Sequence, residues 1–313
     1  MKYIKDFKEG EYINDVYLVK SKVSGTSSKG TAYYSVILQD KTGTIDAKIW
    51  NTNDPGIDEF DKLDYVAVNG EISVFKGSFQ LKINRLRVAR EGEYIMSDYI
   101  PCSSKNIDEM YAEFTGLIKT IKNPSYKALL EDLFVNDADF AKKFKASSAA
   151  KSVHHGFVGG LLEHSLSVSK LCDYYSTAYP ILKRDLLLTA AMCHDIGKIY
   201  ELSEFPENDY TDEGNLLGHI VMGSNMIGKR AAKIEGFSRQ DLLQLQHCIL
   251  AHHGKLEYGS PKTPSLVEAL ALNYADDTDA KMETFKEILE NNSENNGWLG
   301  FQKFLDGNVR ATV

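Results

Sequence analysis

Three polar side chains that are costly to bury lie within apolar segments of this chain. His164 belongs to the segment 161–175, and the adjacent pair His194 and Asp195 closes the segment 184–196. Histidine and aspartate are rarely fully buried, and an unpaired buried charge is expensive. A divalent cation would supply the missing partner, because neutral imidazole and carboxylate together suit first-row divalent ions. These residues therefore favour a helical domain with a metal in its interior.

Further candidate ligands occur in other helical segments. Apolar residues recur at helical spacing from about residue 151 to residue 290, in several separate segments. The candidate metal ligands are His164, His194, Asp195, His219, His252, His253 and Asp276. Ligands drawn from four or five helices predict the interior of a helical bundle, where carboxylate–histidine centres are usually built. Each residue alone can be explained without a metal, as a core histidine, a residue at a helix end or part of a solvated acidic face. The whole set together favours a metal.

The N-terminal residues 1–95 follow a strand-like pattern instead. Five short segments alternate apolar and polar residues, with turn signals at 39–43 and 76–77. Five strands in one small unit are compatible with an OB-fold barrel, and the segment 38–50 resembles the strand–turn–strand core of nucleic-acid-binding OB-folds. Aromatic rings and lysines on such a barrel can stack bases and bind phosphates, although barrel aromatics are more often core. The candidates are Tyr33, Lys48, Trp50, Phe75, Phe79 and Lys82.

The sequence therefore predicts a multi-domain chain, with an all-β OB-fold barrel followed by an all-α helical bundle. The expected parts are a nucleic-acid-binding domain at 1–95, a helical linker at 96–150, a metal-binding helical domain at 151–290 and a C-terminal tail at 291–313. The tail is polar and glycine-rich except for Trp298, Phe301 and Phe304. A tail of this kind can fold back onto another surface.

Charge and cysteine content restrict the partners and the compartment. The formal net charge is −8, so no global positive field attracts nucleic acid or an anionic membrane. A polyanion would have to be held locally, by a groove or by metals. The four cysteines are scattered without Cys-x-x-Cys spacing, and we find no apolar run long enough to cross a bilayer. We expect a cytoplasmic protein with no membrane partner.

The order of the candidate ligands over residues 150–285 resembles that of the HD-domain metal-dependent phosphohydrolases. Family members that bind one metal use four ligands, and the resemblance matches these ligands to His164, His194, Asp195 and Asp276 of this chain. His219 and His252 or His253 match members that hold two or more metals.

The resemblance favours two metals in this chain, with Asp195 bridging them. His164 and Asp276 would hold one ion, and His219 with His252 or His253 would hold the other. Lys198 lies within one turn of Asp195 and is a candidate for stabilising transition-state charge, with a surface lysine as the alternative. Asp195 and Lys198 are therefore the candidate catalytic residues.

The two halves together resemble the bacterial YhaM-type 3′-to-5′ exoribonucleases, notably in the segment 154–164, His-His-Gly-Phe-Val-Gly-Gly-Leu-Leu-Glu-His. The resemblance implies hydrolysis of single-stranded RNA, with single-stranded DNA left open, and release of nucleoside monophosphates from a 3′ end. It implies manganese, with cobalt, magnesium or iron as alternatives, and a homo-oligomer. His154 and His155 are expected in a loop, with a place at the substrate entrance as the alternative.

Two other functions remain open at this point. One is a phosphohydrolase of small nucleotides or cyclic dinucleotides, in which the OB-fold is a regulatory module. The other is a non-catalytic nucleic-acid-binding protein with a structural metal. The HD-like ligand order is compatible with each of them.

Overall fold

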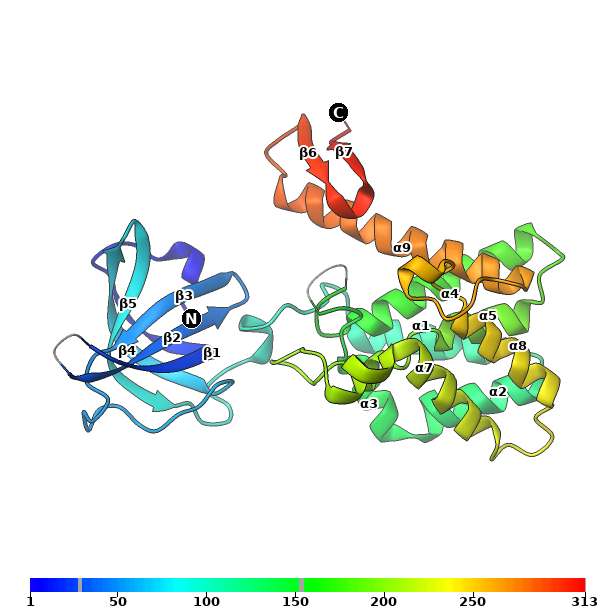
Figure 1. Cartoon of the computed structure of the whole chain (residues 1–313), viewed down its shortest axis with the longest axis horizontal. Coiled ribbons are helices and arrows are strands. Elements are labelled where there is room, and N and C mark those ends of the chain that lie inside the picture. The colour runs from blue at the N-terminus through cyan, green and yellow to red at the C-terminus, as the bar shows by residue number, and fades with distance from the viewer. Residues whose placement is uncertain (28–29, 152–154, 313) are drawn as a thin grey trace. The chain divides into compact units, whose positions relative to one another are not determined.

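A computed structural model describes residues 1–27, 30–151 and 155–312 of the chain (Figure 1). The chain divides into two compact units, Met1–Pro101 and Cys102–Val313. Each unit has its own hydrophobic core. The first unit is built from strands and the second mainly from helices, as the change in hydrophobic periodicity predicts.

The first unit is a closed five-stranded barrel, which confirms the predicted OB-fold architecture. Its strands are β1 (Tyr12–Thr26), β2 (Ala32–Asp40), β3 (Gly43–Ile49), β4 (Tyr65–Phe75) and β5 (Ser78–Val88), in the spatial order β1-β2-β3-β5-β4. The strand β1 has 15 residues and a register shift between Val19 and Ser21. Its first half pairs with β4 and its second half with β2, so this bent strand closes the barrel.

Alternate residues of each strand fill the barrel. On β3, Ile45, Ala47 and Ile49 are buried, while Lys48 between them points to the opposite side. Only the antiparallel hairpins β2–β3 and β4–β5 could be read directly from the turn signals. The parallel pairing of β3 with β5 joins residues far apart in the sequence.

The second unit is a helical bundle followed by a β-hairpin (Figure 1). Its α-helices are α1 (Ile107–Ile118), α2 (Pro124–Glu131), α3 (Ala138–Ala146), α4 (Gly160–Ala178), α5 (Arg184–Cys193), α6 (Lys198–Glu201), α7 (Asp212–Ala231), α8 (Arg239–Leu250) and α9 (Val267–Asn291). The side chain of Asn123 accepts hydrogen bonds from the first amides of α2, as expected for a helix cap. Within the described residues, no helix is long and apolar enough to cross a membrane.

Two regions of the second unit differ from the sequence-based expectations. The expected linker contributes Phe114, Leu130 and Phe144 to the same core as α4 and α5, because the apolar stripes of its short helices need a partner to bury them. The helix α9 continues to Asn291, the first residue of the expected tail. The tail that follows forms the hairpin β6 (Trp298–Gln302) and β7 (Gly307–Arg310), joined by the 3-10 turn η5 (Lys303–Leu305).

Candidate metal centre

The structure brings all seven candidate metal ligands together in the second unit. They come from three helices and two helix ends. His164 lies on α4, His219 on α7 and Asp276 on α9, whereas the pairs His194–Asp195 and His252–His253 directly follow α5 and α8. His194, Asp195 and His252 are almost completely buried. Such a cluster of buried imidazoles and carboxylates requires a compensating partner.

One group of ligand atoms forms around His164. Its Nε2 atom lies 3.1 Å from His194 Nε2 and 3.1 Å from Asp276 Oδ1. The Oδ2 atom of Asp195 lies 3.5 Å from His164 Nε2 and 3.4 Å from His194 Nε2. Two imidazole nitrogens and two carboxylate oxygens therefore face one another at the separations expected of atoms that share a cation.

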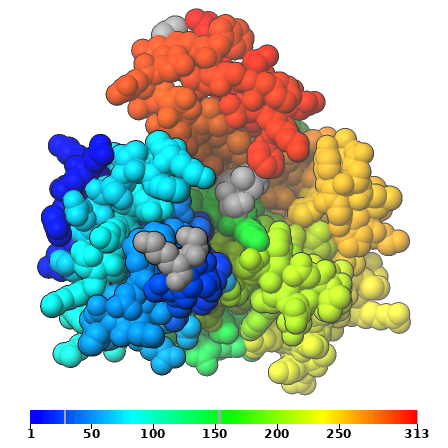
Figure 2. All heavy atoms as spheres, turned by 60° about the vertical axis from the view of Figure 1, so that its left-hand side comes forward, coloured from blue at the N-terminus to red at the C-terminus, as the bar shows by residue number. Residues whose placement is uncertain are grey.

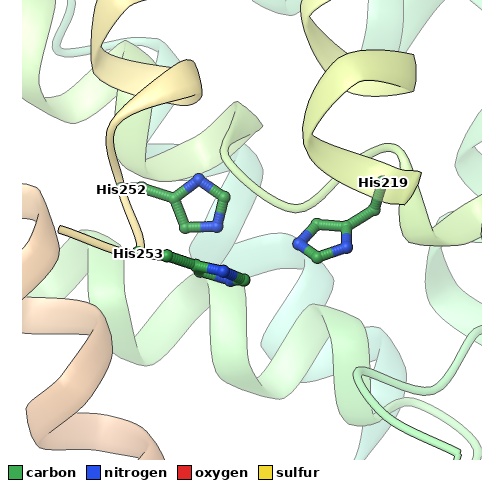
Figure 3. Close-up of side chains that lie close together, drawn as sticks. All are labelled: His219, His252 and His253. Atoms are coloured by element: carbon green, nitrogen blue, oxygen red, sulfur yellow. The ribbon is translucent and has the colours of Figure 1, made fainter. Parts of the chain in front are cut away.

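A second group forms on the other oxygen of Asp195. Its Oδ1 atom lies 3.4 Å from His219 Nε2 and 3.5 Å from His252 Nε2. Figure 3 shows the ring of His219 facing those of His252 and His253, and one ligand atom from each of these three histidines lies within 4.8 Å of the others. Asp195 Oδ1, His219 Nε2 and His252 Nε2 are buried without a hydrogen-bond partner among the described residues. Three buried atoms whose lone pairs face one another without a hydrogen-bond donor fit a bound cation.

The five histidines are held in one tautomer. In each ring, Nδ1 lies 2.7–2.9 Å from an oxygen that cannot donate a proton. These oxygens belong to Asp279 for His164, Ala191 for His194, Glu201 for His219, Ile249 for His252 and Tyr258 for His253. Nδ1 must therefore be the donor, which leaves the Nε2 lone pair available to a metal.

Two glycines place His219 beside Asp195. Gly218 has a φ of 73°, where a side chain would be strained, and it bends α7 immediately before His219. Gly197 follows Asp195 by two residues, and a Cβ atom there would lie 2.0 Å from the carbonyl oxygen of His219. The close approach of these two backbone segments brings ligands from α5 and α7 into the same site.

For His252, His253 and Asp195, the surroundings favour the forms that bind metals. Burial lowers the pKa of His253 to about 4 and also lowers the pKa of His252, so both rings are neutral near pH 7. Burial alone would raise the pKa of Asp195, but the positive charge of Lys198 and the contact with His194 hold it well below its ordinary value. The Nζ atom of Lys198 lies 2.7 Å from Asp195 Oδ2. Asp195 is therefore an ionised carboxylate.

Sequence reasoning missed two residues that orient these ligands. Asp279 was not among the candidates, but it is buried and accepts from both His164 and His155. Its spacing of three residues from Asp276 places both on one face of α9, which was the available signal. Glu201 carried no such signal, because its contact with His219 Nδ1 at 2.9 Å depends on the fold. His155 lies in a loop, as expected, and it is buried, contacts Asp279 and lines the cavity of the metal centre, while His154 lies outside the described residues.

The donor set fits divalent cations. Two oxygens of a buried, ionised Asp195 face two separate groups of histidine nitrogens, and the remaining donors are imidazole or carboxylate. This combination suits manganese, iron, cobalt and zinc better than calcium, which takes oxygen ligands.

The candidate nucleic-acid-binding residues lie in two separate regions of the barrel. The rings of Tyr33 and Trp50 have centroids 5.3 Å apart, and Lys48 Nζ lies 5.4 Å from the Tyr33 centroid. Lys82 pairs in register with Lys48, so these four residues share one outer face, which we call the β2–β3–β5 face. Phe75 and Phe79 are exposed at the β4–β5 hairpin instead.

The comparisons with known families agree with both units. Residues 161–281 match the HD domain, and residues 17–89 match an OB-fold nucleic acid binding domain. The chain is thus an HD-domain protein with an N-terminal OB-fold. It is 37% identical over 290 residues to the 3′-5′ exoribonuclease YhaM of Geobacillus sp. (strain WCH70), an alignment that covers 92% of this chain and 88% of that protein. The chain therefore belongs to the YhaM family.

Solved structures also resemble the N-terminal unit. The second OB-fold domain of replication protein A from Methanococcus maripaludis is 19% identical and covers 29% of this chain and 96% of that domain, with a TM-score of 0.24. A replication protein A heterotrimer bound to ssDNA contains a chain that is 19% identical, with 27% of this chain and 62% of that chain covered and a TM-score of 0.22.

Proposed function

We propose that this chain is a metal-dependent 3′-to-5′ exoribonuclease that hydrolyses single-stranded RNA and releases nucleoside monophosphates. The observation that carries the proposal is the buried carboxylate of Asp195, whose two oxygens face two groups of histidine nitrogens. Membership of the YhaM family supports the reaction and its polarity. Single-stranded DNA as a second substrate, a homo-oligomeric assembly and a cytoplasmic location belong to the same proposal.

The proposed ligand assignment uses two ions, with manganese as the preferred metal. His164, His194 and Asp276 would hold one ion, His219 with His252 and His253 would hold the other, and Asp195 would bridge them. Two ions in such a site supply a nucleophile at neutral pH and offset charge on the phosphoryl oxygens.

The protein's own groups would then position and protect the substrate. Asp279 and Glu201 fix the rings of His164 and His219 through their Nδ1 atoms. Lys198 is held against Asp195 and lines the same cavity, which has a volume of about 930 Å³, so its ammonium group can stabilise charge that develops on a phosphoryl group. The mostly buried site limits access of bulk water and strengthens these interactions.

The direct test is a 5′-labelled single-stranded RNA incubated with the purified protein and Mn²⁺. We expect a ladder of products that shorten from the 3′ end, together with nucleoside monophosphates. Turnover of free nucleotides or cyclic dinucleotides without cleavage of the RNA would instead select the small-molecule phosphohydrolase. Inertness toward every substrate, with RNA binding retained, would favour a non-catalytic binding protein.

Glu201→Gln is expected to weaken the metal site without removing a ligand. The Oε1 atom of Glu201 accepts from both the backbone N–H and the Nδ1–H of His219, and the neutral amide loses the negative charge that raises the basicity of that ring. Partners of this kind contribute about 10–100-fold in metal affinity or activity. We expect the Mn²⁺ concentration for half-maximal activity to rise by about that factor. Glu204→Gln, an exposed carboxylate on the same segment, is the matched control; an equal change in both variants would contradict the role of Glu201.

Trp50→Ala is expected to weaken the binding of single-stranded RNA to the β2–β3–β5 face. The Trp50 side chain is 48% exposed and lies against Tyr33, so it offers a ring on which a base can stack. Loss of one such contact costs about 1–3 kcal/mol, which is about 5- to 150-fold in Kd. Fluorescence anisotropy with a labelled oligonucleotide measures the change. Tyr12→Ala removes a ring from β1 that is 68% exposed, more than Trp50, and should leave Kd unchanged. If both variants bind normally, the β2–β3–β5 face is not the binding surface.

A further inference from the structure

The cavity that contains the metal centre extends to the C-terminal hairpin. It has a volume of about 930 Å³, at the upper end of the range of about 300–1,000 Å³ for small-molecule sites. His164, Asp195 and Asp276 line it, and so do residues 303–306 of η5 and the turn that follows. In Figure 2 the red residues of the hairpin and the gold residues of the loop after α8 lie on the same face of the second unit. The hairpin is therefore part of the cavity wall.

The helix α9 connects the metal centre with this wall. Asp276, Ala280 and Lys281 all line the cavity, with Ala280 one turn beyond Asp276 on α9 and Lys281 directly after it. Lys281 lies about 7.5 Å along the helix axis from Asp276, at a rise of about 1.5 Å per residue. The chain then reverses after Asn291, and η5 returns to contact α9. A substrate bound at the metal centre would thus meet η5 if it extended along α9.

Three aromatic side chains are exposed around this one cavity. Tyr258, Tyr274 and Phe304 line it and have exposed fractions of 61%, 58% and 63%. They come from the loop after α8, from α9 and from η5. A single exposed aromatic needs no explanation, but three around a polar cavity provide faces for flat apolar groups. Nucleobases are such groups, because each base has a π-face that stacks on an aromatic ring.

Three lysines accompany these rings. Lys255, Lys281 and Lys303 line the cavity together with Lys198 of the metal centre, and four carboxylates also line it: Asp195, Asp276, Asp277 and Asp306. Lys255 pairs with Glu257 at 3.4 Å and Lys281 with Asp277 at 2.7 Å. For Lys303 the described part of the chain shows no ion pair, and its side chain is exposed. Its ammonium group is therefore the one most available to an anionic ligand, and exposed salt bridges such as the other two exchange easily.

We propose that the C-terminal hairpin forms a substrate-binding subsite of the active cavity, in which Phe304 stacks on a base close to the 3′ end of the RNA and Lys303 binds a nearby phosphate. This inference rests on the proposed nuclease function and adds to it the part of the chain that holds the strand upstream of the scissile bond. The contacts are sequence-tolerant, since stacking and phosphate binding do not read base edges. Phe304 and Lys303 are binding residues and do not touch the reacting atoms.

The test uses the full-length protein and RNA with 2-aminopurine near its 3′ end. In the Asp195→Asn background, which is not expected to cut the strand, we expect 2-aminopurine fluorescence to be quenched on binding, as stacking on Phe304 requires. Phe304→Ala should remove most of the quenching, and Phe304→Tyr should retain it. In the otherwise unaltered enzyme, Phe304→Ala should raise KM for a short RNA by about 5- to 150-fold and leave kcat within about threefold.

The matched control is Phe301→Ala, since Phe301 is 61% exposed on β6 but does not line the cavity. Normal quenching and KM in Phe301→Ala, together with the losses in Phe304→Ala, support the subsite. Equal losses in both variants would mean that the hairpin acts through its fold, and no loss in Phe304→Ala would mean that the strand does not reach it; either result overturns the inference. Failure of the unaltered protein to shorten RNA would instead overturn the proposed function, because the binding measurement is independent of cleavage.

Discussion

Asp195→Asn is expected to reduce kcat by about a thousandfold or more while the protein remains folded. Asp195 is the residue whose two oxygens face both groups of histidines, so its neutral amide would weaken both proposed ion sites. Metal ions contribute several kcal/mol of transition-state stabilisation, and a loss of about 4 kcal/mol corresponds to about a thousandfold in rate. Asparagine preserves the volume of the side chain, so packing should be retained. Single-turnover cleavage of labelled RNA measures the loss, and circular dichroism reports the fold.

A control carboxylate separates this effect from a general loss of negative charge. Asp139→Asn removes an exposed carboxylate from the first turn of α3 and should change kcat by less than about twofold. If both variants are folded and Asp195→Asn cleaves RNA at a rate within tenfold of the unaltered enzyme, Asp195 does not bridge the two proposed ions.

Addition of Mn²⁺ to metal-free protein is expected to raise the unfolding temperature of the second unit by about 5–10 °C. The ligands come from α4, α7 and α9 and from the ends of α5 and α8, so an ion that binds them ties most of the bundle together. Saturation at about 100 times Kd stabilises the folded state by about 2.7 kcal/mol, and 1 kcal/mol shifts the Tm of a unit this large by about 2–4 °C. Differential scanning calorimetry measures the shift, and a chelator should reverse it.

The barrel and an altered site serve as controls for this shift. The barrel holds none of the candidate ligands, so a separate transition of the first unit should not move with Mn²⁺. Asp195→Asn should lose most of the shift. An unchanged shift in that variant would place the stabilising ion elsewhere.

The strands of the barrel were predictable because their information is local. Alternation and the turn signals at 39–43 and 76–77 identify β2 to β5 nearly residue by residue. The end of β1 was not predictable, since the residues after Val19 are held by pairing with β2 across a register shift. The C-terminal hairpin was also missed, because its short strands contain glycines and mixed polarity that resemble a loop.

The candidate ligands could be collected from the sequence because each is chemically unusual in its apolar helical segment. Which of these ligands lie together could not be predicted from the sequence, because it depends on how the helices pack. His194, which the sequence left without a partner ion, lies 3.1 Å from His164 Nε2, and this distance assigns it to the first group. The pairing of Glu201 with His219 likewise depends on the bend at Gly218, which no periodicity reports. The adjacent residues Asp276 and Asp277 both line the cavity but differ in their contacts: Asp276 faces His164, whereas Asp277 pairs with Lys281.

The most direct measurement of the central claim is the anomalous scattering of manganese in crystals of the protein grown with Mn²⁺. We expect two peaks per chain about 3.5–4 Å apart, with Asp195 between them. One peak should lie beside His164, His194 and Asp276, and the other beside His219 and His252. A single ion bound away from Asp195, or no ion in the pocket at saturating Mn²⁺, would contradict the account.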